Sequence, residues 1–188
     1  MRIARRAWWK DLADVDIGRL VFLDEAGAKT NMIRLYGRTL GGQRLLDAAP
    51  HGHWGTTTML SSLRLEGAPA AMVIEGATDT AVFLAYVERV LVPSLRSGDI
   101  VVMDNLAPHK NPAVAEMIQA AGADVWYLPA YSPDFNPIER MWSKVKAWLR
   151  KARARTLEGL TDAIGQALAA VTRADAAGWF ESCGYRYD

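Results

Sequence analysis

Cysteine and histidine are scarce in this sequence of 188 residues, which contains one cysteine, Cys183, and three histidines. A single cysteine excludes an internal disulfide bond, and so few of these residues do not supply a structural zinc cluster. Apolar runs long enough to span a membrane are absent, and the basic N-terminal stretch lacks the apolar segment of a signal peptide. From these absences we expect a cytoplasmic protein without a membrane partner.

Acidic residues are missing from one stretch, residues 140–155, although the net charge of the whole chain is only +1. A run of like charge is commonly a solvated helix face whose long side chains cover apolar surface. An uninterrupted positive face also suits a polyanion such as the phosphate backbone of DNA. We favour the second interpretation. The run contains seven basic residues, of which Arg153 and Arg155 are the last two. We expect DNA contacts from the five that precede them: Arg140, Lys144, Lys146, Arg150 and Lys151.

Length and composition indicate one globular domain, with 51% apolar and 23% charged residues. The first half of the chain predicts successive strands at residues 19–25, 31–37, 56–67 and 68–76. Helices and strands then alternate: a helix over 82–91, a strand over 99–105, a helix over 111–121, a strand over 125–129 and helices beginning near 137 and 157. This order predicts an α/β protein whose mixed sheet is covered by helices on both faces, as in the ribonuclease-H-like fold.

Two aspartates lie at predicted strand ends, Asp24 after an apolar run and Asp104 after Ile100–Met103. Ligands of such sheets bind at the carboxyl ends of parallel strands, so both acids are candidates for a site. Each also has a structural alternative as a residue that begins a turn. Glu25 follows Asp24 directly, and because side chains alternate along a strand only one of the two can face a given site.

Thirty-four residues separate Asp104 from a third acid, Glu139. Asn136 fits a helix N-cap, and Glu139 then fits a capping box, which is sufficient reason for a glutamate there. The same helix N-terminus also favours the ionised carboxylate that a metal requires. Asp134 is the rival for the third position, and we interpret it as a turn residue.

Three acids from distant parts of a sequence repel one another when they meet. At about 4 Å and an effective dielectric constant of 20, two carboxylates repel by roughly 4 kcal/mol. Their usual reason to gather is a divalent cation. His51 and His53 could be mistaken for a second metal site, but without a third nitrogen or sulfur ligand we interpret them as loop residues.

Several strings of the sequence together resemble one family, the DDE transposases of the mariner-like superfamily in its bacterial insertion-sequence branch. The strings are VFLDEAG, MIRLYGR, PHGHWGTTT, GDIVVMDNLAPHK and YLPAYSPDFNPIERMWSKVKAWLR. They extend from about residue 20 to about residue 155. The combination of MDN and HK with YSPDFNPIE at this separation is the most specific part of the resemblance.

The resemblance implies a ribonuclease-H-like domain in which Asp24, Asp104 and Glu139 are the catalytic, metal-binding acids. It implies two Mg²⁺ ions, with Mn²⁺ as a substitute, and a reaction that cuts DNA and transfers the freed strand to target DNA. The partners would be transposon ends and target DNA, and the active form a homodimer. Further residues are expected to support the acids or to contact DNA: Asn105, His109, Lys110 and Asn136.

We expect three parts in the chain: a basic leader or linker remnant at 1–18, the catalytic domain at 19–155, and a helical extension at 156–188 packed on the same domain. Members of the family carry helix-turn-helix segments ahead of the catalytic domain, so we expect end recognition to be encoded elsewhere. Two other functions fit the same residues. One is a truncated DNA-binding or regulatory fragment without catalysis, and the other is a structure-specific nuclease that lacks strand transfer.

Overall fold

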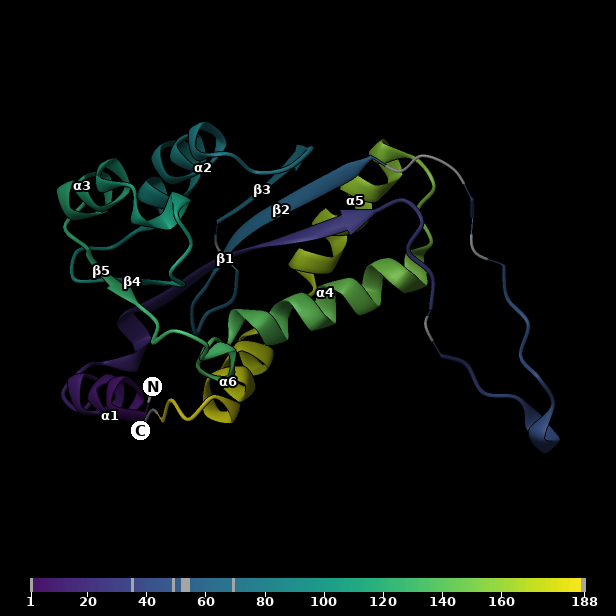
Figure 1. Ribbon diagram of the computed structural model, residues 1–188, viewed down its shortest axis with the longest axis horizontal. Helices are drawn as coiled ribbons and strands as arrows, with labels where there is room; N and C mark the ends of the chain where they lie inside the picture. Colours follow the sequence, from purple (N-terminus) through teal and green to yellow (C-terminus); the bar gives the residue numbers. More distant parts are fainter. Residues whose placement is uncertain (1, 35, 49, 52–54, 69, 187–188) are drawn as a thin grey trace.

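A five-stranded sheet of order β3-β2-β1-β4-β5 forms the centre of the computed structural model, which describes residues 2–34, 36–48, 50–51, 55–68 and 70–186 (Figure 1). β1 (Leu20–Lys29) pairs antiparallel with β2 (Thr56–Leu63), which pairs antiparallel with β3 (Ala71–Glu75). β4 (Ile100–Met103) and β5 (Asp124–Tyr127) pair in parallel on the other side of β1. The mixed α/β sheet predicted from the sequence is confirmed.

Helices cover both faces of this sheet. One face packs against α2 (Thr80–Tyr86), its continuation in a π-helical turn (Val87–Leu91) and α3 (Pro112–Ala120). The other face carries α1 (Arg2–Asp11), α4 (Ile138–Ala152), α5 (Leu157–Ala169) and α6 (Arg173–Ser182). Burial of apolar side chains on each side of the strands is the main stabilising contribution to this arrangement. Within the described part of the chain, no helix has both the length and the apolar character needed to cross a membrane.

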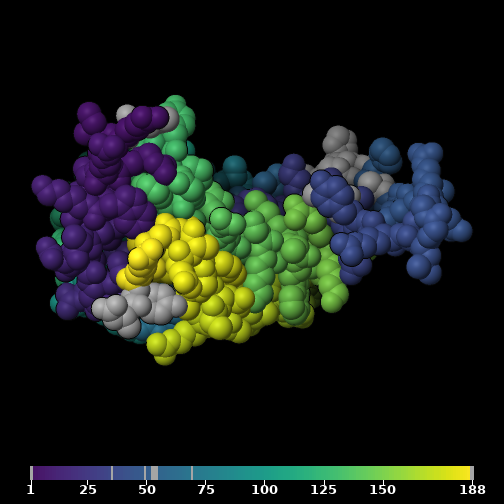
Figure 2. Space-filling view, turned by 90° about the horizontal axis from the view of Figure 1, so that it is seen from below, coloured from purple at the N-terminus to yellow at the C-terminus, as the bar shows by residue number. Residues whose placement is uncertain are grey.

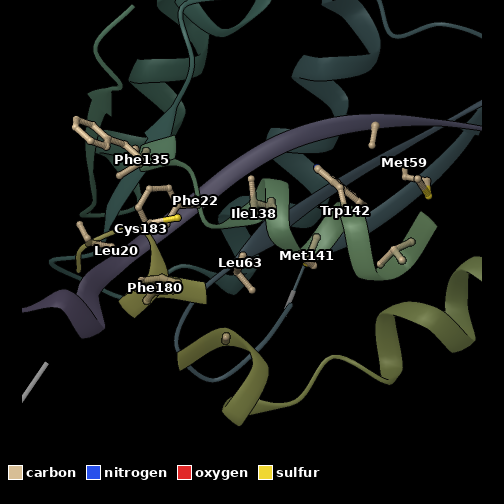
Figure 3. Close-up of a cluster of buried hydrophobic side chains, with 14 of the residues drawn as sticks. Leu20, Phe22, Met59, Leu63, Phe135, Ile138, Met141, Trp142, Phe180 and Cys183 are labelled. Carbon is tan, nitrogen blue, oxygen red and sulfur yellow. The ribbon is translucent and has the colours of Figure 1, made fainter. Parts of the chain in front are cut away.

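The larger core lies between the sheet and α4. Figure 3 shows the inward side chains of β1 and β2, Leu20, Phe22 and Leu63 among them, facing Ile138 and Trp142 of α4. Odd and even positions of β1 divide between the two cores: Leu20 and Phe22 belong to this core, whereas their neighbours along the strand belong to the other. The period of two along a strand therefore places Asp24 on the α4 face of the sheet.

The first strand is longer than predicted. β1 does not end at Asp24 but continues to Lys29, because its antiparallel pairing with β2 extends over Phe22–Lys29. Its parallel pairing with β4, by contrast, covers only Leu20–Phe22. Asp24 therefore lies just past the last residue of β1 that pairs with β4, at the carboxyl end of the parallel part of the sheet.

The strand predicted at residues 31–37 is wrong: the described residues of this segment form no strand. None of the five strands of the sheet pairs with the described residues of this segment, so its backbone groups have no neighbouring strand to bond with. The described residues between β1 and β2 instead belong to an extended loop that projects from the domain, and among them Leu40–Gly42 form a short 3₁₀ turn (Figure 1). His51 is an exposed loop residue, and His53 lies outside the described residues.

The N-terminal stretch is a helix rather than a polar leader. In α1 the indole of Trp8 is 5% exposed and lies edge-on to Trp126 of β5, with ring centroids 5.7 Å apart. Trp9 packs against Phe135 with centroids 5.0 Å apart. Figure 2 shows α1 beside α6, whose helix was also not predicted. The division of the chain into three parts stays a prediction, although α1 is part of the larger core.

Helix starts were predicted with mixed success. The starts predicted near residues 111 and 157 are confirmed: Asn111 caps α3 and Thr156 caps α5, each accepting a hydrogen bond from a backbone amide. The N-cap assigned to Asn136 is wrong, because Pro137 occupies that position and no side chain caps α4. Asn136 is instead buried, and its Oδ1 accepts no hydrogen bond among the described residues.

Candidate active site

A cavity of about 450 Å³ opens where the parallel strands end and α4 begins. Its walls come from β1, the loop after β4, the loop after β5 and the first turn of α4. All three acids singled out in the sequence, Asp24, Asp104 and Glu139, line it. Among the described residues that line the cavity there is no lysine or arginine, so three carboxylates share it without a side-chain cation.

Asp24 is the most deeply placed of the three acids. Burial, together with the negative charges of Glu139 and Glu25, raises the pKa of Asp24 to about 7. Its Oδ1 accepts a hydrogen bond of 2.8 Å from the amide of Glu25, which opposes this rise. A buried carboxylate among other carboxylates is a costly arrangement unless a cation compensates it.

Asp104 follows the last residue of β4 and is held from two directions. Its Oδ1 accepts a hydrogen bond of 2.9 Å from the amide of Leu106 and lies 2.6 Å from Nδ1 of His109. Burial works against ionisation of Asp104, but the interactions with His109 and the Leu106 amide outweigh it, so its pKa lies below the usual value. The contacts with His109 and the Leu106 amide therefore favour the ionised form of Asp104.

His109 is fully buried between two carboxylates. Its Nε2 lies 2.9 Å from Oε2 of Glu25, and its Nδ1 faces Asp104. Its ring packs against that of Phe83, with centroids 4.6 Å apart and the ring planes tilted by 34°. Burial disfavours the charged imidazolium, yet contacts with Asp104 and Glu25 raise the pKa of His109 to about 9. The result is a chain of three residues, Glu25–His109–Asp104, that begins on β1 and ends in the cavity.

Glu139 lies in the first turn of α4 and is exposed to the cavity. The capping-box alternative for it is wrong, because α4 has no side-chain cap. The helix N-terminus nevertheless favours negative charge at this position. Capping therefore does not explain why a glutamate occupies this position, and its place on the cavity wall does need an explanation.

The donor set of the cavity fits a hard divalent cation, which prefers carboxylate oxygens. Among the described residues, the protein contacts of Asp24 and Asp104 both use Oδ1, which leaves Oδ2 of each without a protein partner. The three side chains do not form a closed cage, since no group of three or more acidic, histidine or cysteine side chains in the described part of the chain is arranged to hold a metal. The walls thus offer ligands from three elements around an open site.

The four residues expected to support the acids divide into two pairs. Asn105 and Asn136 line the cavity, and Nδ2 of Asn105 donates a hydrogen bond of 2.6 Å to the carbonyl of Leu128. His109 supports Asp104 from behind, whereas Lys110 is exposed and lies outside the cavity, with its Nζ 6.0 Å from the ring centroid of Tyr127. Lys110 is the member of this group that the structure does not bring into the site.

Asp134, the rival third acid, is not part of the cavity wall. It lies in a 3₁₀ turn, and both of its oxygens accept hydrogen bonds from the guanidinium of Arg5 in α1. The hydrogen bond from Arg5 lowers the pKa of Asp134. Asp134 is therefore the turn residue that the sequence indicated, and it has an additional role in holding α1.

The basic run on α4 is partly engaged within the protein. Lys144 binds Asp175 of α6 with a distance of 2.5 Å, and Arg153 pairs with Asp47. Arg155 donates to the carbonyls of Thr30 and Met32. Within the described part of the chain, ion pairs involve none of the remaining four: Arg140, Lys146, Arg150 and Lys151.

Two features of the site were not identified from the sequence. Glu25 was expected only to face away from Asp24, but the face it occupies contains His109, through which it reaches the cavity. Tyr131, which lines the cavity and is 87% exposed, was given no role. The alternation of side chains along β1 was the available signal for Glu25, and the signal for Tyr131 was its place as the first residue of the motif YSPDFNPIE.

Comparison with known proteins gives the family. Residues 19–161 match the family model described as DDE superfamily endonuclease, which covers most of the chain. The chain belongs to this family. No curated protein sequence matches the chain. The DDE superfamily assignment agrees with the resemblance seen in the motifs.

Solved structures of Mos1 transposase share the fold of this DDE domain. The Mos1 paired-end complex with the left transposon end matches with a TM-score of 0.73 and 15% identity, over 97% of this chain and 57% of that chain. The mariner Mos1 paired-end complex with Mg matches at 0.71 and 18%, over 97% and 58%. The catalytic domain of Mos1 mariner transposase alone matches at 0.68 and 15%, over 97% and 83%. The chain thus spans little more than half of the longer Mos1 chains and most of the isolated catalytic domain.

Proposed function

We propose that this chain is the catalytic part of a transposase that cuts DNA at the ends of an insertion sequence and joins the freed 3′ end to target DNA. The observation that carries the proposal is the convergence of Asp24, Asp104 and Glu139 on one cavity at the carboxyl end of the parallel part of the sheet. The match to DDE superfamily endonucleases and the fold shared with Mos1 transposase support it.

Asp24, Asp104 and Glu139 are the residues proposed to hold two Mg²⁺ ions, or Mn²⁺ in their place. Bound divalent ions in such a site activate the attacking hydroxyl and stabilise the charge on the leaving oxygen of a phosphodiester. Structures of Mos1 with Mg and with Mn support this choice of metals. The oxygens that Asp24 and Asp104 leave without protein partners are the ones available for coordination.

The other residues of the site position these acids and the DNA. His109 and Glu25 hold Asp104 in one orientation, while Asn105 ties the loop after β4 to Leu128. The unpaired bases of α4, Lys146, Arg150 and Lys151 in particular, are proposed to contact the DNA backbone on the positive surface that leads away from the cavity. Lys144 is not proposed as a contact, because Asp175 already occupies it.

Three further features belong to the same proposal. The active form is a homodimer on transposon ends, in keeping with the paired-end complexes of Mos1. End recognition comes from helix-turn-helix segments that precede this domain in the complete transposase. Residues 19–155 are the catalytic domain, and residues 156–188 extend it.

Nicking of DNA that contains the inverted repeats of the element is the direct test. Wild type with Mg²⁺, supplied with its DNA-recognition part, is expected to nick the DNA and to yield strand-transfer products, and Asp104→Asn is expected to do neither. Asp134→Asn is the matched control, because this acid lies nearby but outside the cavity. Equal nicking by wild type and Asp104→Asn would remove the proposed role of the acids, and nicking without joined products would favour a nuclease.

A further inference from the structure

The cavity that contains the three acids has a second, apolar side. Leu106, Leu128, Pro129 and Pro133 line it, together with Tyr131 at its mouth. Two of these are unusually exposed for apolar or aromatic residues, with Tyr131 at 87% and Leu106 at 46%. Catalysis by carboxylates and metal ions does not require an apolar wall, so its presence beside the acids needs a separate explanation.

Tyr131 is held in a backbone conformation that tyrosine rarely adopts. Its φ is 57°, in the left-handed region. Among the described residues, Tyr131 and Arg153 are the two that have a positive φ without being glycine. The conformation is unfavourable for a residue with a bulky side chain. Strain of this kind persists where the surrounding structure imposes it, and it is found more often at ligand-binding sites than elsewhere.

The loop that carries Tyr131 is fixed on both sides. Before it, the amide of Leu128 donates a hydrogen bond of 2.9 Å to the carbonyl of Met103, and Asn105 donates to the carbonyl of Leu128. After it, the buried hydroxyl of Ser132 accepts a hydrogen bond of 2.9 Å from Arg5 of α1. A rigid loop therefore presents the phenol ring to solvent at the edge of the acidic cavity.

We propose that Tyr131 and Leu106 form a stacking site for one unpaired nucleobase of the reacting DNA strand, next to the phosphate that is cut. This inference rests on the proposed function, which places that phosphate at the acids. Aromatic rings bind the flat faces of bases, and such stacking is tolerant of sequence. A base inside the duplex cannot reach the ring, so the base in question is unstacked from its neighbours.

The charge of the cavity favours a base over other occupants of the wall. Among the described lining residues there is no lysine or arginine that could bind an additional phosphate or an acidic peptide beside the acids. A neutral base, tethered to the phosphate that the site is proposed to bind, needs no such cation and covers the exposed ring. Its neighbour Leu106 supplies a second apolar contact from the loop after Asp104.

The test uses a duplex with a short 3′ overhang whose first unpaired base is 2-aminopurine, titrated with the full chain in Ca²⁺ so that binding is separated from cutting. Stacking on Tyr131 quenches the fluorescence of this base. Tyr131→Phe is expected to retain both quenching and affinity. Tyr131→Gly is expected to lose the quenching and to bind the overhang about tenfold more weakly.

Glycine is chosen so that the variant still folds, because glycine adopts a positive φ without strain. Asparagine tolerates it as well, so Tyr131→Asn is a second variant with the same expected loss of quenching. Thermal unfolding of each variant, measured alongside, should show midpoints no lower than that of wild type. The same duplex with 2-aminopurine placed in the paired region is the control for general effects of binding, and its signal should not depend on Tyr131.

Quenching that persists in Tyr131→Gly would overturn the stacking site, and so would the lack of quenching by wild type. The other possible occupant of the apolar wall is a second copy of this chain, and sedimentation distinguishes it from a nucleobase. If wild type sediments as a dimer without DNA and Tyr131→Gly as a monomer, the patch is a protein interface and the proposal fails. Nicking in Mg²⁺ is measured separately, so nicking without quenching removes the stacking site and leaves the proposed function intact.

Discussion

Nδ1 of His109 lies 2.6 Å from Oδ1 of Asp104, inside the protein and behind the cavity wall. The same imidazole reaches Glu25 through Nε2, so a residue of β1 acts on the end of β4 through a fully buried side chain. Partners of this kind orient the carboxylates of metal sites and fix their protonation. Glu25, which contacts Asp104 only through His109, is thus expected to matter for function although it does not line the cavity.

Replacement of Glu25 by glutamine tests this relationship. The amide keeps the shape and one hydrogen bond of the side chain but removes the charge that stabilises protonated His109. We expect nicking to fall about 10- to 100-fold, with a matching loss of Mn²⁺ affinity, as is typical for residues that support metal ligands. The measurements are nicking rates at saturating DNA and a Mn²⁺ titration at constant pH.

Glu75→Gln is the control for Glu25→Gln, because Glu75 ends β3 of the same sheet and is exposed. It should leave both rates and metal affinity unchanged. Equal activity of Glu25→Gln and wild type would show that Asp104 keeps its orientation without the outer carboxylate.

The buried pair of Arg64 and Asp99 is predicted to stabilise the fold far more than the exposed pair of Arg96 and Glu66. Arg64 and Asp99 lie 2.7 Å apart with side chains 2% and 4% exposed, whereas the other two are 63% and 50% exposed. Asp99→Asn leaves a buried guanidinium without its counter-charge, and should cost about 3–5 kcal/mol in free energy of unfolding. Glu66→Gln should cost less than about 1 kcal/mol.

Urea unfolding of both variants, with a common slope, checks this difference. Addition of Arg64→Met to Asp99→Asn should recover part of the loss, because no unpaired charge then remains buried. Similar costs for Asp99→Asn and Glu66→Gln would mean that solvent reaches the buried pair.

The sequence predicted the fold where local signals agreed with the tertiary context. Apolar runs predicted β4 and β5, and the starts of α3 and α5 were predicted near residues 111 and 157, because the signals that begin a helix lie close together in the chain. The predicted end of β1 was wrong, because the length of this strand depends on its pairing with β2, which the local sequence pattern does not encode. The strand at 31–37 failed for the same reason, as pattern alone cannot supply a partner strand.

The three acids could be found from the sequence, while their supporting structure could not. Asp104 and Asp24 follow apolar strands, and the family motifs added Glu139. Nothing in the sequence could show that Pro137, rather than Asn136, is the N-cap residue of α4, or that His109 turns inward between Glu25 and Asp104. Such interactions join residues far apart in the chain, so they follow from the assembled fold.

Binding of duplex DNA is predicted to depend on salt through the basic residues of α4 that remain unpaired. Replacing Lys146, Arg150 and Lys151 by glutamine should lower the slope of log K against log salt by about 0.9 for each DNA phosphate that the variant no longer neutralises. The slope is measured by fluorescence anisotropy at several NaCl concentrations. Arg89→Gln, in the π-helical turn on the opposite face of the sheet, should leave the slope unchanged. A slope that is equal in the triple variant and wild type would place the DNA elsewhere.

Asp175 is predicted to make stability depend on pH in the acid range. Its Oδ2 accepts hydrogen bonds from Lys144 and from the hydroxyl and amide of Thr172, and these lower the pKa of Asp175 from 3.8 to about 2. Because the folded pKa lies below the unfolded one, the stabilisation is present above about pH 4 and is lost as the pH falls toward 2.

The carboxylate of Asp175 and the ammonium of Lys144 are 25% and 35% exposed, so solvent screening reduces the effect to about 1 kcal/mol. Asp175→Asn should therefore be less stable than wild type by about this amount at pH 6, and the difference should shrink between pH 4 and pH 2. Urea unfolding at each pH measures it, and 1 M NaCl should reduce the difference at pH 6 as well. Asp162→Asn, an exposed acid of α5, controls for the general effect of removing a negative charge. A difference that stays constant from pH 6 to pH 2 would assign the stabilisation to the shape of the cap and not to its charge.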